Sequence, residues 1–229
     1  GILYHRMDQL FNNPVGFLFW ALALVTAITI HEFAHAASAE RLGDPTPRLM
    51  GRLTLNPLAH LDLLGTIMLF IAHFGWGKPV VFDPYNLRHP RRDGAIISLA
   101  GPVANLVLAT LCAILFQLLL NFRLPLVSNS VGSIALYILI GLLQPVIVLN
   151  VVLAVFNLVP IHPLDGFKIV GGILPGDYAK QWAELEPYGM LFLIFLIFPN
   201  FSSVSPISRI ITPVNNAILS ILLPSTPFI

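Results

Sequence analysis

The stretch AITIHEFAHAASAE (residues 27–40) places two histidines and a glutamate at the end of an otherwise apolar run. The residues before it, FLFWALAL (17–24), are typical of a helix that crosses a membrane. Ionisable side chains inside such a helix are costly and, as a rule, functional. His31, Glu32 and His35 are therefore candidate functional residues, and other parts of the chain must supply any further residues of their site.

The composition indicates an integral membrane protein. Of the 229 residues, 56% are hydrophobic and only 10% are charged, whereas a soluble domain carries about 25% charged residues. So few charges cannot cover a surface that faces water. The net charge of +1 and the lack of a dense basic run predict that nucleic acid is not a partner. A single cysteine rules out a framework of disulfides within the chain.

Apolar runs of about 20 residues, the length that crosses a bilayer, define the candidate spans. Three are clear: 14–38, 94–120 and 132–158. Residues 187–199 form a shorter run, and residues 206–223 are apolar but interrupted by polar side chains, so we predict a helical pair there. The sequence thus predicts an all-α, polytopic membrane protein.

The basic residues predict how the spans are oriented. Seven of the twelve Lys and Arg residues lie between the first two spans, in region 39–93. They are Arg41, Arg48, Arg52, Lys78, Arg88, Arg91 and Arg92. Cytoplasmic loops carry such an excess of positive charge, so we place this region in the cytoplasm and the 121–131 connection outside. The end of the first span that carries the two histidines then faces the cytoplasm.

The segment LDLLGTIMLFIAHFGWGKPVVF (61–82) is ambiguous, because its uninterrupted apolar part is short for a span. If it returns to the side where it began, the segment after residue 158 reaches the same membrane face as His31. If it crosses, that segment ends on the opposite face. We therefore favour a re-entrant or β-like hairpin between the first two spans, packed on protein because lipid cannot satisfy bare backbone groups.

His31-Glu32-Phe33-Ala34-His35 is an HExxH pattern. Positions i and i+4 share one face of a helix, so both imidazoles can bind one metal ion. Glu32 is rotated from His31 by about 100° and can take a proton from a water molecule, as in zinc hydrolases. The same pattern also arises by chance as an exposed patch on soluble helices, but a membrane span has no use for three such residues in packing.

A catalytic zinc ion usually has three protein ligands, so one is missing from the HExxH helix. The candidate segment is FNLVPIHPLDGFKIV (156–170), where the third span ends. Its Asp165 would complete a His2Asp site, because the orientation of the spans brings this carboxylate to the face of His31. His162 is a rival ligand. Asp165 could also be an ordinary turn residue with a solvated carboxylate.

Two asparagines lie near the end of the third span. Asn157 could stabilise the oxyanion of a tetrahedral intermediate with its amide. It could equally form an interhelical hydrogen bond, which is common for polar residues in membrane bundles. For Asn150, two turns earlier, we expect the interhelical hydrogen bond. Gly101, Pro102 and Asn105 are expected to serve close helix packing, although the Asn105 side chain could face the site.

Together these elements resemble the site-2 protease family, intramembrane zinc metalloproteases of the M50 type. The resemblance rests on HEFAH with its flank AHAASAERLGD (34–44), GRLTLNPLAHLDLLGT (51–66), SLAGPVANLVLA (98–109) and FNLVPIHPLDG (156–166). HExxH alone is weak, but HExxH combined with the distant LDG, both at membrane depth, is specific. The GRLTLNPL run looks like the compact subgroup without PDZ or CBS domains.

The resemblance implies about six helical segments around a three-helix catalytic core. It implies His31, His35 and Asp165 as the ligands of one zinc ion, and Glu32 as the general base. The substrates would be membrane proteins cleaved in or near a transmembrane helix, toward the cytoplasmic side of the cell membrane. Residues 51–82 would form the edge that receives an unwound substrate strand, since an extended peptide can pair with such an edge.

We therefore predict a single integral-membrane peptidase domain over residues 1–229, with a zinc cofactor, the lipid bilayer as its surroundings and transmembrane-helix proteins as substrates. The main alternative is a zinc transporter or other metal-binding membrane protein. Transporters often show internal repeats and string ligands along a pathway, whereas this chain has one compact cluster and no repeat. The sequence leaves the oligomeric state open.

Overall fold

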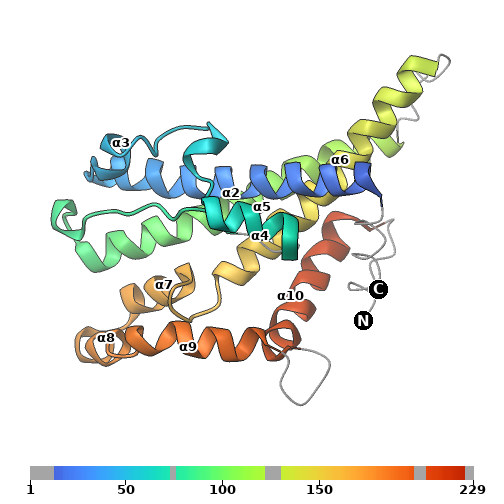
Figure 1. The fold of residues 1–229 in the computed structure, drawn as a ribbon. Coiled ribbons are helices and arrows are strands. Elements are labelled where there is room, and N and C mark those ends of the chain that lie inside the picture. Colours follow the sequence, from blue (N-terminus) through green and yellow to red (C-terminus); the bar gives the residue numbers. More distant parts are fainter. Residues whose placement is uncertain (1–12, 73–75, 122–129, 199–204, 225–229) are drawn as a thin grey trace.

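The computed structural model describes residues 13–72, 76–121, 130–198 and 205–224. Its framework is three long helices, α2 (Pro14–Leu42), α5 (Pro90–Asn121) and α6 (Ser130–Asn157) (Figure 1). They correspond to the three predicted spans. By length and composition, these are the helices within the described residues that could cross a membrane.

Local sequence signals fix both ends of α2. The Asn13 side chain accepts a hydrogen bond of 3.1 Å from the backbone N–H of Val15, and proline follows at the first helical position. Both features are favoured at helix N-termini. Gly43 ends the helix with φ of 106°, a left-handed conformation that glycine adopts without strain. The HExxH residues therefore lie within one uninterrupted helix.

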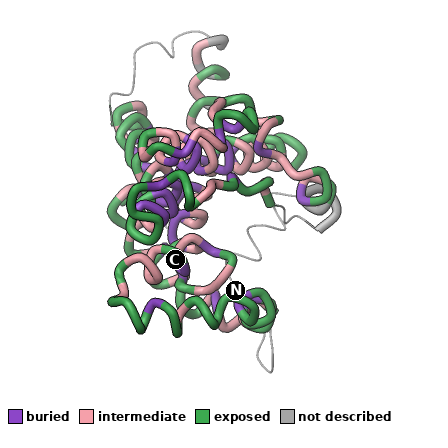
Figure 2. Tube along the Cα trace, turned by 90° about the vertical axis from the view of Figure 1, so that its left-hand side faces the viewer, coloured by how far each residue is buried: buried purple, intermediate pink, exposed green. Residues whose placement is uncertain are grey.

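α2 and α5 lie side by side and run in opposite directions, and α6 packs against both (Figure 1). Figure 2 shows the buried positions concentrated in this bundle. One half of the bundle holds an apolar core, and we call it the apolar half. Its fully or nearly fully buried members include Ala109, Ala113, Phe116, Leu143, Ile147 and Val151.

The segment predicted as a re-entrant hairpin does turn back on itself. Its apolar part forms the short helix α4 (Leu63–Ala72). Leu61 and Gly77 then face each other in an isolated antiparallel bridge, and the Lys78 N–H donates to the His60 carbonyl over 2.7 Å. No strand longer than this bridge occurs in the described ranges. The hairpin is thus helical on one arm and extended on the other.

A second layer follows α6. It contains α7 (Asp165–Ile173), α8 (Gly176–Ala183), α9 (Glu186–Ile197) and α10 (Pro206–Leu222) (Figure 1). α9 and α10 are the predicted helical pair, and α10 returns to pack on α6. Short turns of helix, α3 (Thr46–Leu49), η1 (Pro57–Ala59) and η2 (Pro84–Asn86), lie in the connection between α2 and α5. The all-α fold with a three-helix core is confirmed.

Candidate active site

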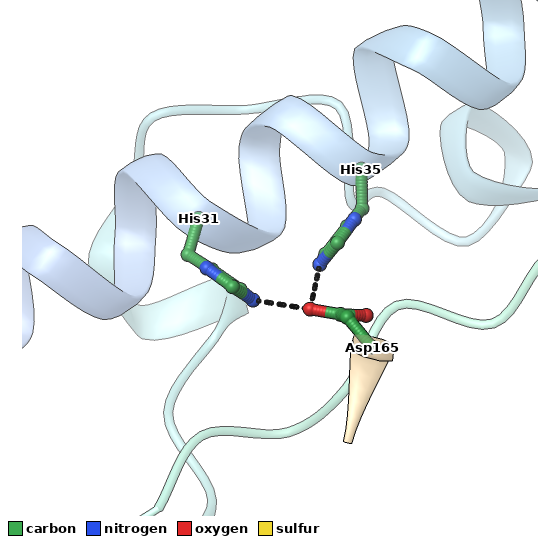
Figure 3. Close-up of side chains that lie close together, drawn as sticks. All are labelled: His31, His35 and Asp165. Atoms are coloured by element: carbon green, nitrogen blue, oxygen red, sulfur yellow. Dashed lines mark hydrogen bonds and ion pairs between the residues drawn. The ribbon is translucent and has the colours of Figure 1, made fainter. Parts of the chain in front are cut away.

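Three side chains from distant parts of the chain meet beside α2. Asp165 Oδ2 lies 3.1 Å from His31 Nε2 and 3.2 Å from His35 Nε2 (Figure 3). The two histidines are buried, and the Asp165 side chain is 15% exposed. One ligand atom from each residue falls within 4.8 Å of the others, which is the spacing of a metal site. In the described residues these three form the group of His, Cys, Asp and Glu side chains that could hold a metal ion.

Asp165 reaches the histidines because α7 packs against α5, directly after the turn that follows α6. Gly166 packs against the backbone carbonyls of Leu158 and Val159, so any side chain at this position would clash with the main chain. Farther along α7, the Arg91 guanidinium donates to the carbonyls of Gly171 and Leu174. The Asp-Gly pair thus combines a ligand with the small residue that lets the ligand approach.

Gly101 of α5 forms the wall behind the imidazoles. A Cβ atom at this position would lie 2.5 Å from His35 Nε2 and 2.7 Å from His31 Cε1. Real Cβ atoms do not approach so closely, so no larger residue fits without moving the rings. The two histidines therefore turn their Nε2 atoms toward Asp165 in a space that only glycine leaves open.

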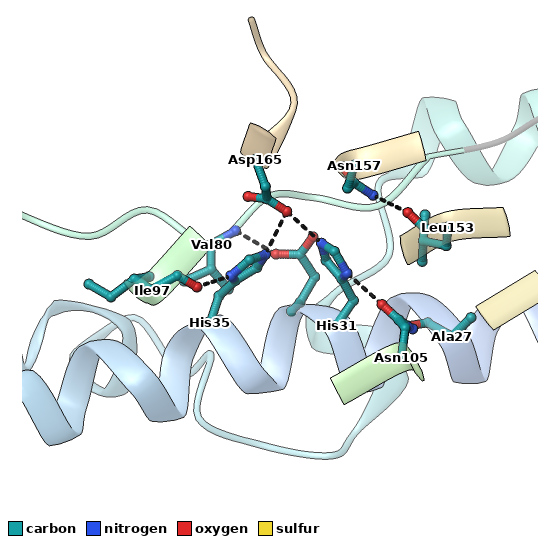
Figure 4. Close-up of polar contacts among 10 residues, drawn as sticks. Ala27, His31, His35, Val80, Ile97, Asn105, Leu153, Asn157 and Asp165 are labelled. Carbon is teal, nitrogen blue, oxygen red and sulfur yellow. Dashed lines mark hydrogen bonds and ion pairs between the residues drawn. The ribbon is translucent and has the colours of Figure 1, made fainter. Parts of the chain in front are cut away.

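The other nitrogen of each imidazole is also held. His35 Nδ1 lies 2.7 Å from the carbonyl oxygen of Ile97, and His31 Nδ1 lies 2.6 Å from Asn105 Oδ1 (Figure 4). A carbonyl oxygen can only accept, so each Nδ1 carries the hydrogen and donates it. Ligating histidines typically donate their second N–H in this way.

The carboxyl group of Asp165 is held in its charged form. Burial favours the neutral acid, but the interactions with His31 and His35 outweigh it and keep the pKa of Asp165 well below its usual range. An anionic oxygen that faces two imidazole nitrogens needs a shared cation, supplied by protons on the rings or by a metal ion. Two imidazoles and one carboxylate are the donor types that zinc prefers, so the residues fit such an ion.

Glu32 lies next to this cluster and faces the extended arm of the hairpin. Its Oε2 accepts a hydrogen bond of 2.8 Å from the backbone N–H of Val80 (Figure 4). Lys168 of α7 reaches the same arm, with its ammonium 4.8 Å from the centre of the Phe82 ring. The arm is therefore tied to both helices that supply the cluster.

Comparison with known proteins gives the family. A family model described as peptidase family M50 matches residues 19–197, which include all three residues of the cluster. The chain belongs to peptidase family M50. No solved structure matches it.

Several relatives of this M50 chain carry protease names. A Bacillus subtilis protein named "Putative zinc metalloprotease YwhC" is 35% identical over 213 residues, 92% of each chain. Proteins named "Putative zinc metalloprotease Rip2" from Mycolicibacterium smegmatis and Mycobacterium tuberculosis are 35% and 33% identical. These two matches cover 73% and 74% of this chain but 62% of each relative's length.

The other predicted residues have different surroundings. His162 is not part of the cluster in the described residues. Its Nδ1 lies 3.7 Å from a carboxylate oxygen of Glu186, and its ring meets the edge of Phe167. The interhelical hydrogen bond expected for Asn150 is present, since its Oδ1 accepts from Asn105 Nδ2 over 2.6 Å. Asn157 donates to the Leu153 carbonyl of its own helix over 3.0 Å, and its role in catalysis stays a prediction.

Sequence reasoning missed part of this M50 site. Gly101 was expected to serve helix packing, but its close neighbours are the two imidazoles. Asn105 contacts His31 directly, and the Ile97 carbonyl contacts His35. The polar Asn105 on an apolar helix was a signal for the first contact. A backbone carbonyl leaves no trace in the sequence, so the second contact had none.

Proposed function

We propose that this chain is an intramembrane zinc metalloprotease that hydrolyses peptide bonds within or near transmembrane helices of membrane proteins. One observation carries the proposal: the Asp165 carboxylate, 134 residues beyond His31, meets both HExxH imidazoles. Those imidazoles belong to a helix long enough to cross a membrane. Membership of peptidase family M50 supports a protease. The names of the relatives support zinc as the metal.

His31 Nε2, His35 Nε2 and Asp165 Oδ2 are proposed to hold one zinc ion. Bound there, zinc would polarise the scissile carbonyl and lower the pKa of water to about 7. The chain's own contribution is orientation. Gly101 leaves room for both rings, and the acceptors at Nδ1 leave each Nε2 free to face the metal. Both histidines are buried, so bulk water has little access to the Nε2 atoms that would bind the metal.

Glu32 is the proposed general base. It follows His31 directly in the helix, so its carboxylate lies beside the imidazoles without being needed as a ligand. One of its oxygens accepts from the Val80 N–H, and the carboxylate has further lone pairs to accept a proton from the attacking water. It would then deliver that proton to the leaving amine. Removing such a base typically costs about 10²–10⁴ in rate.

Asn157 is the proposed donor to the oxyanion. Its amide group carries two hydrogens, and within the described residues one of them is used on the Leu153 carbonyl. The other is available in principle to a developing negative charge. Such a donor is worth about 10²–10³ in kcat in other proteases.

The substrate is proposed to enter as an extended strand, because a helical peptide bond is shielded until its helix opens. Residues 51–82 are the proposed receiving edge, and the extended arm beside Glu32 supports this placement. The excess of Lys and Arg in region 39–93 favours a multi-pass protein of the cell membrane with its active site toward the cytoplasm. We propose one peptidase domain over residues 1–229, of which the family model covers 19–197.

The test is Glu32→Gln in proteoliposomes that contain a model single-span substrate. We expect zinc content equal to that of the wild type and cleavage reduced by at least about 10². Glu184→Gln, at an exposed glutamate in the turn after α8, is the matched control and should cleave normally. Zinc flux is measured in the same vesicles. Normal cleavage by Glu32→Gln, or zinc flux without any cleavage, would contradict the proposal.

A further inference from the structure

Asn105 is buried between the three long helices, with no exposed surface. Its Nδ2 donates to the Ala27 carbonyl of α2 over 3.0 Å and to Asn150 Oδ1 of α6 over 2.6 Å. Its Oδ1 accepts from His31 Nδ1 over 2.6 Å. One side chain of α5 therefore binds both α2 and α6. Figure 4 shows its contact with His31, a proposed zinc ligand.

The partners of Asn105 fix which way its amide points. A backbone carbonyl can only accept a hydrogen bond, so the Ala27 oxygen requires the NH2 group of Asn105 on its side. The second hydrogen of that group goes to Asn150. With both hydrogens used, Oδ1 is the atom left for His31, and a flipped amide would set two oxygens against each other at Ala27.

This orientation determines the state of His31. Because Asn105 Oδ1 can only accept, His31 Nδ1 must carry the hydrogen. Nε2 then presents a lone pair on the side of Asp165 whenever the ring is neutral, as a metal ligand must. His35 is served by the Ile97 carbonyl instead. The two ligands are thus oriented by different means, one by a side chain and one by the main chain.

We propose that Asn105 is a positioning residue for the metal centre: its Oδ1 fixes the ring orientation and the Nδ1 hydrogen of His31, and the Ala27 carbonyl sets which way its amide points. The inference rests on the proposed function, since it assigns His31 to a metal. It goes beyond helix packing, because packing needs only the contacts of Nδ2, whereas positioning needs the acceptor Oδ1.

Three variants separate the two roles. Asn105→Leu removes the acceptor at similar volume. Asn105→Asp keeps an oxygen facing His31 but loses the amide hydrogens that bind Ala27 and Asn150. Asn150→Leu is the matched control, since it removes a contact to Nδ2 and leaves the contact from Oδ1 to His31. The readouts are thermal stability in detergent and zinc affinity, measured by competition with a chromophoric chelator.

We expect Asn105→Leu to weaken zinc affinity by about 10–100-fold, the usual effect of losing a partner of a ligating histidine. Asn105→Asp and Asn150→Leu should bind zinc within about threefold of the wild type, or more tightly for the aspartate, while both lose stability. Zinc affinity that is unchanged in Asn105→Leu, or equally weakened in all three variants, would overturn the proposal.

A measurement on the wild type tests the same contact without any substitution. With ¹⁵N-labelled histidine and saturating zinc, we expect the His31 Nδ1–H to exchange slowly with solvent. The Nδ1–H of His35, bound to the Ile97 carbonyl, is the internal reference. Rapid exchange at His31 beside slow exchange at His35 would refute positioning by Asn105. None of these readouts uses cleavage, so they can fail while Glu32→Gln still behaves as proposed. A wild type that binds no zinc would overturn both.

Discussion

The two halves of the three-helix core are built on different principles. In the half that holds the cluster, buried polar side chains pair with one another or with the main chain: His31 with Asn105, Asn105 with Asn150 and His35 with the Ile97 carbonyl. In the apolar half, α5 and α6 meet each other and α10 through aliphatic and aromatic side chains. Polar contacts fix orientation, because a hydrogen bond has a direction. Apolar packing is nearly non-directional and supplies stability.

This difference predicts two kinds of failure. A change that removes or displaces a proposed metal ligand, or removes the acceptor that orients one, should impair metal binding and hydrolysis, with a smaller effect on folding. A change in the apolar half should lower the free energy of unfolding and leave each folded molecule competent. Substitutions in each half test this separation, and those at the proposed metal ligands should have the largest effect.

Asp165→Asn should abolish cleavage. The amide has nearly the shape of the carboxylate but lacks the charge that faces both imidazoles. Since losing a mere partner of a ligand costs about 10–100-fold in metal affinity, we expect the loss of a ligand to exceed that. Zinc content after dialysis and cleavage of a single-span substrate are the measurements.

The control for this variant is Asp177→Asn. Asp177 pairs with Lys180 over 3.6 Å, and its side chain is 92% exposed, so its charge should matter little. We expect wild-type zinc content and cleavage. Retention of stoichiometric zinc by Asp165→Asn at the affinity of the wild type would show that the third ligand lies elsewhere.

A pair of glycine substitutions compares the cluster with an apolar contact between α6 and α2. Gly101→Ala places a Cβ 2.5 Å from His35 Nε2, and Gly141→Ala places one 2.8 Å from the Phe19 ring. Both overpack a helix contact, which typically costs about 1–3 kcal/mol of stability. Only Gly101→Ala should also weaken zinc affinity, by about 10–100-fold, because the added methyl group would displace the proposed ligands His31 and His35. Equal zinc affinity in the two variants would erase the distinction between the halves.

The sequence predicts most of the fold because span length and charge bias are strong signals. The three long helices, the helical pair and the returning hairpin all follow from apolar runs, from Lys and Arg counts and from the need to bring Asp165 to His31. The contacts that hold the imidazoles were harder to foresee. These contacts depend on which face of α5 is turned toward α2. When most faces of a helix are hydrophobic, the spacing of its apolar residues does not indicate which face that is. For this reason the sequence predicts only helix packing for Gly101, and for Asn105 it leaves packing and a place in the site as alternatives.

In the apolar half, Leu143→Ala should reduce stability without harming the site. Leu143 is 7% exposed and belongs to the apolar core. Truncating such a residue costs about 2–5 kcal/mol through lost contacts and the cavity left behind. Leu139→Ala, one turn earlier and 38% exposed, is the matched control and should change stability little. Unfolding in mixed detergent gives the free energies, and cleavage per folded molecule should equal that of the wild type in both variants.

Outside both halves, a buried aspartate anchors the connection between α2 and α5. Asp44 has no exposed surface. Its carboxylate accepts from the N–H and hydroxyl of Thr46, from the Asn86 amide and from the Asp83 N–H. Burial favours the neutral acid, but these hydrogen bonds outweigh it and lower the pKa of Asp44 below its ordinary value. A substitution of Asp44 therefore tests whether the connection between α2 and α5 contributes to stability independently of the three-helix core.

Because its folded pKa is lowered, Asp44 contributes stability that is fully present above its unfolded pKa, near 4, and is lost as the pH falls through the folded value. Asp44→Asn keeps one acceptor but sets an amide against the Asp83 N–H, so we expect a cost of about 1–2 kcal/mol at neutral pH. The variant should also lose less stability than the wild type between pH 5 and lower pH, as measured by thermal unfolding in detergent. Zinc affinity at neutral pH should not change, since the Asp44 carboxylate contacts Thr46, Asp83 and Asn86 and not the imidazoles. An identical loss of stability with falling pH in both proteins would show that the pKa of Asp44 does not change on folding. A fall in the zinc affinity of Asp44→Asn would show that the connection between α2 and α5 also supports the metal site.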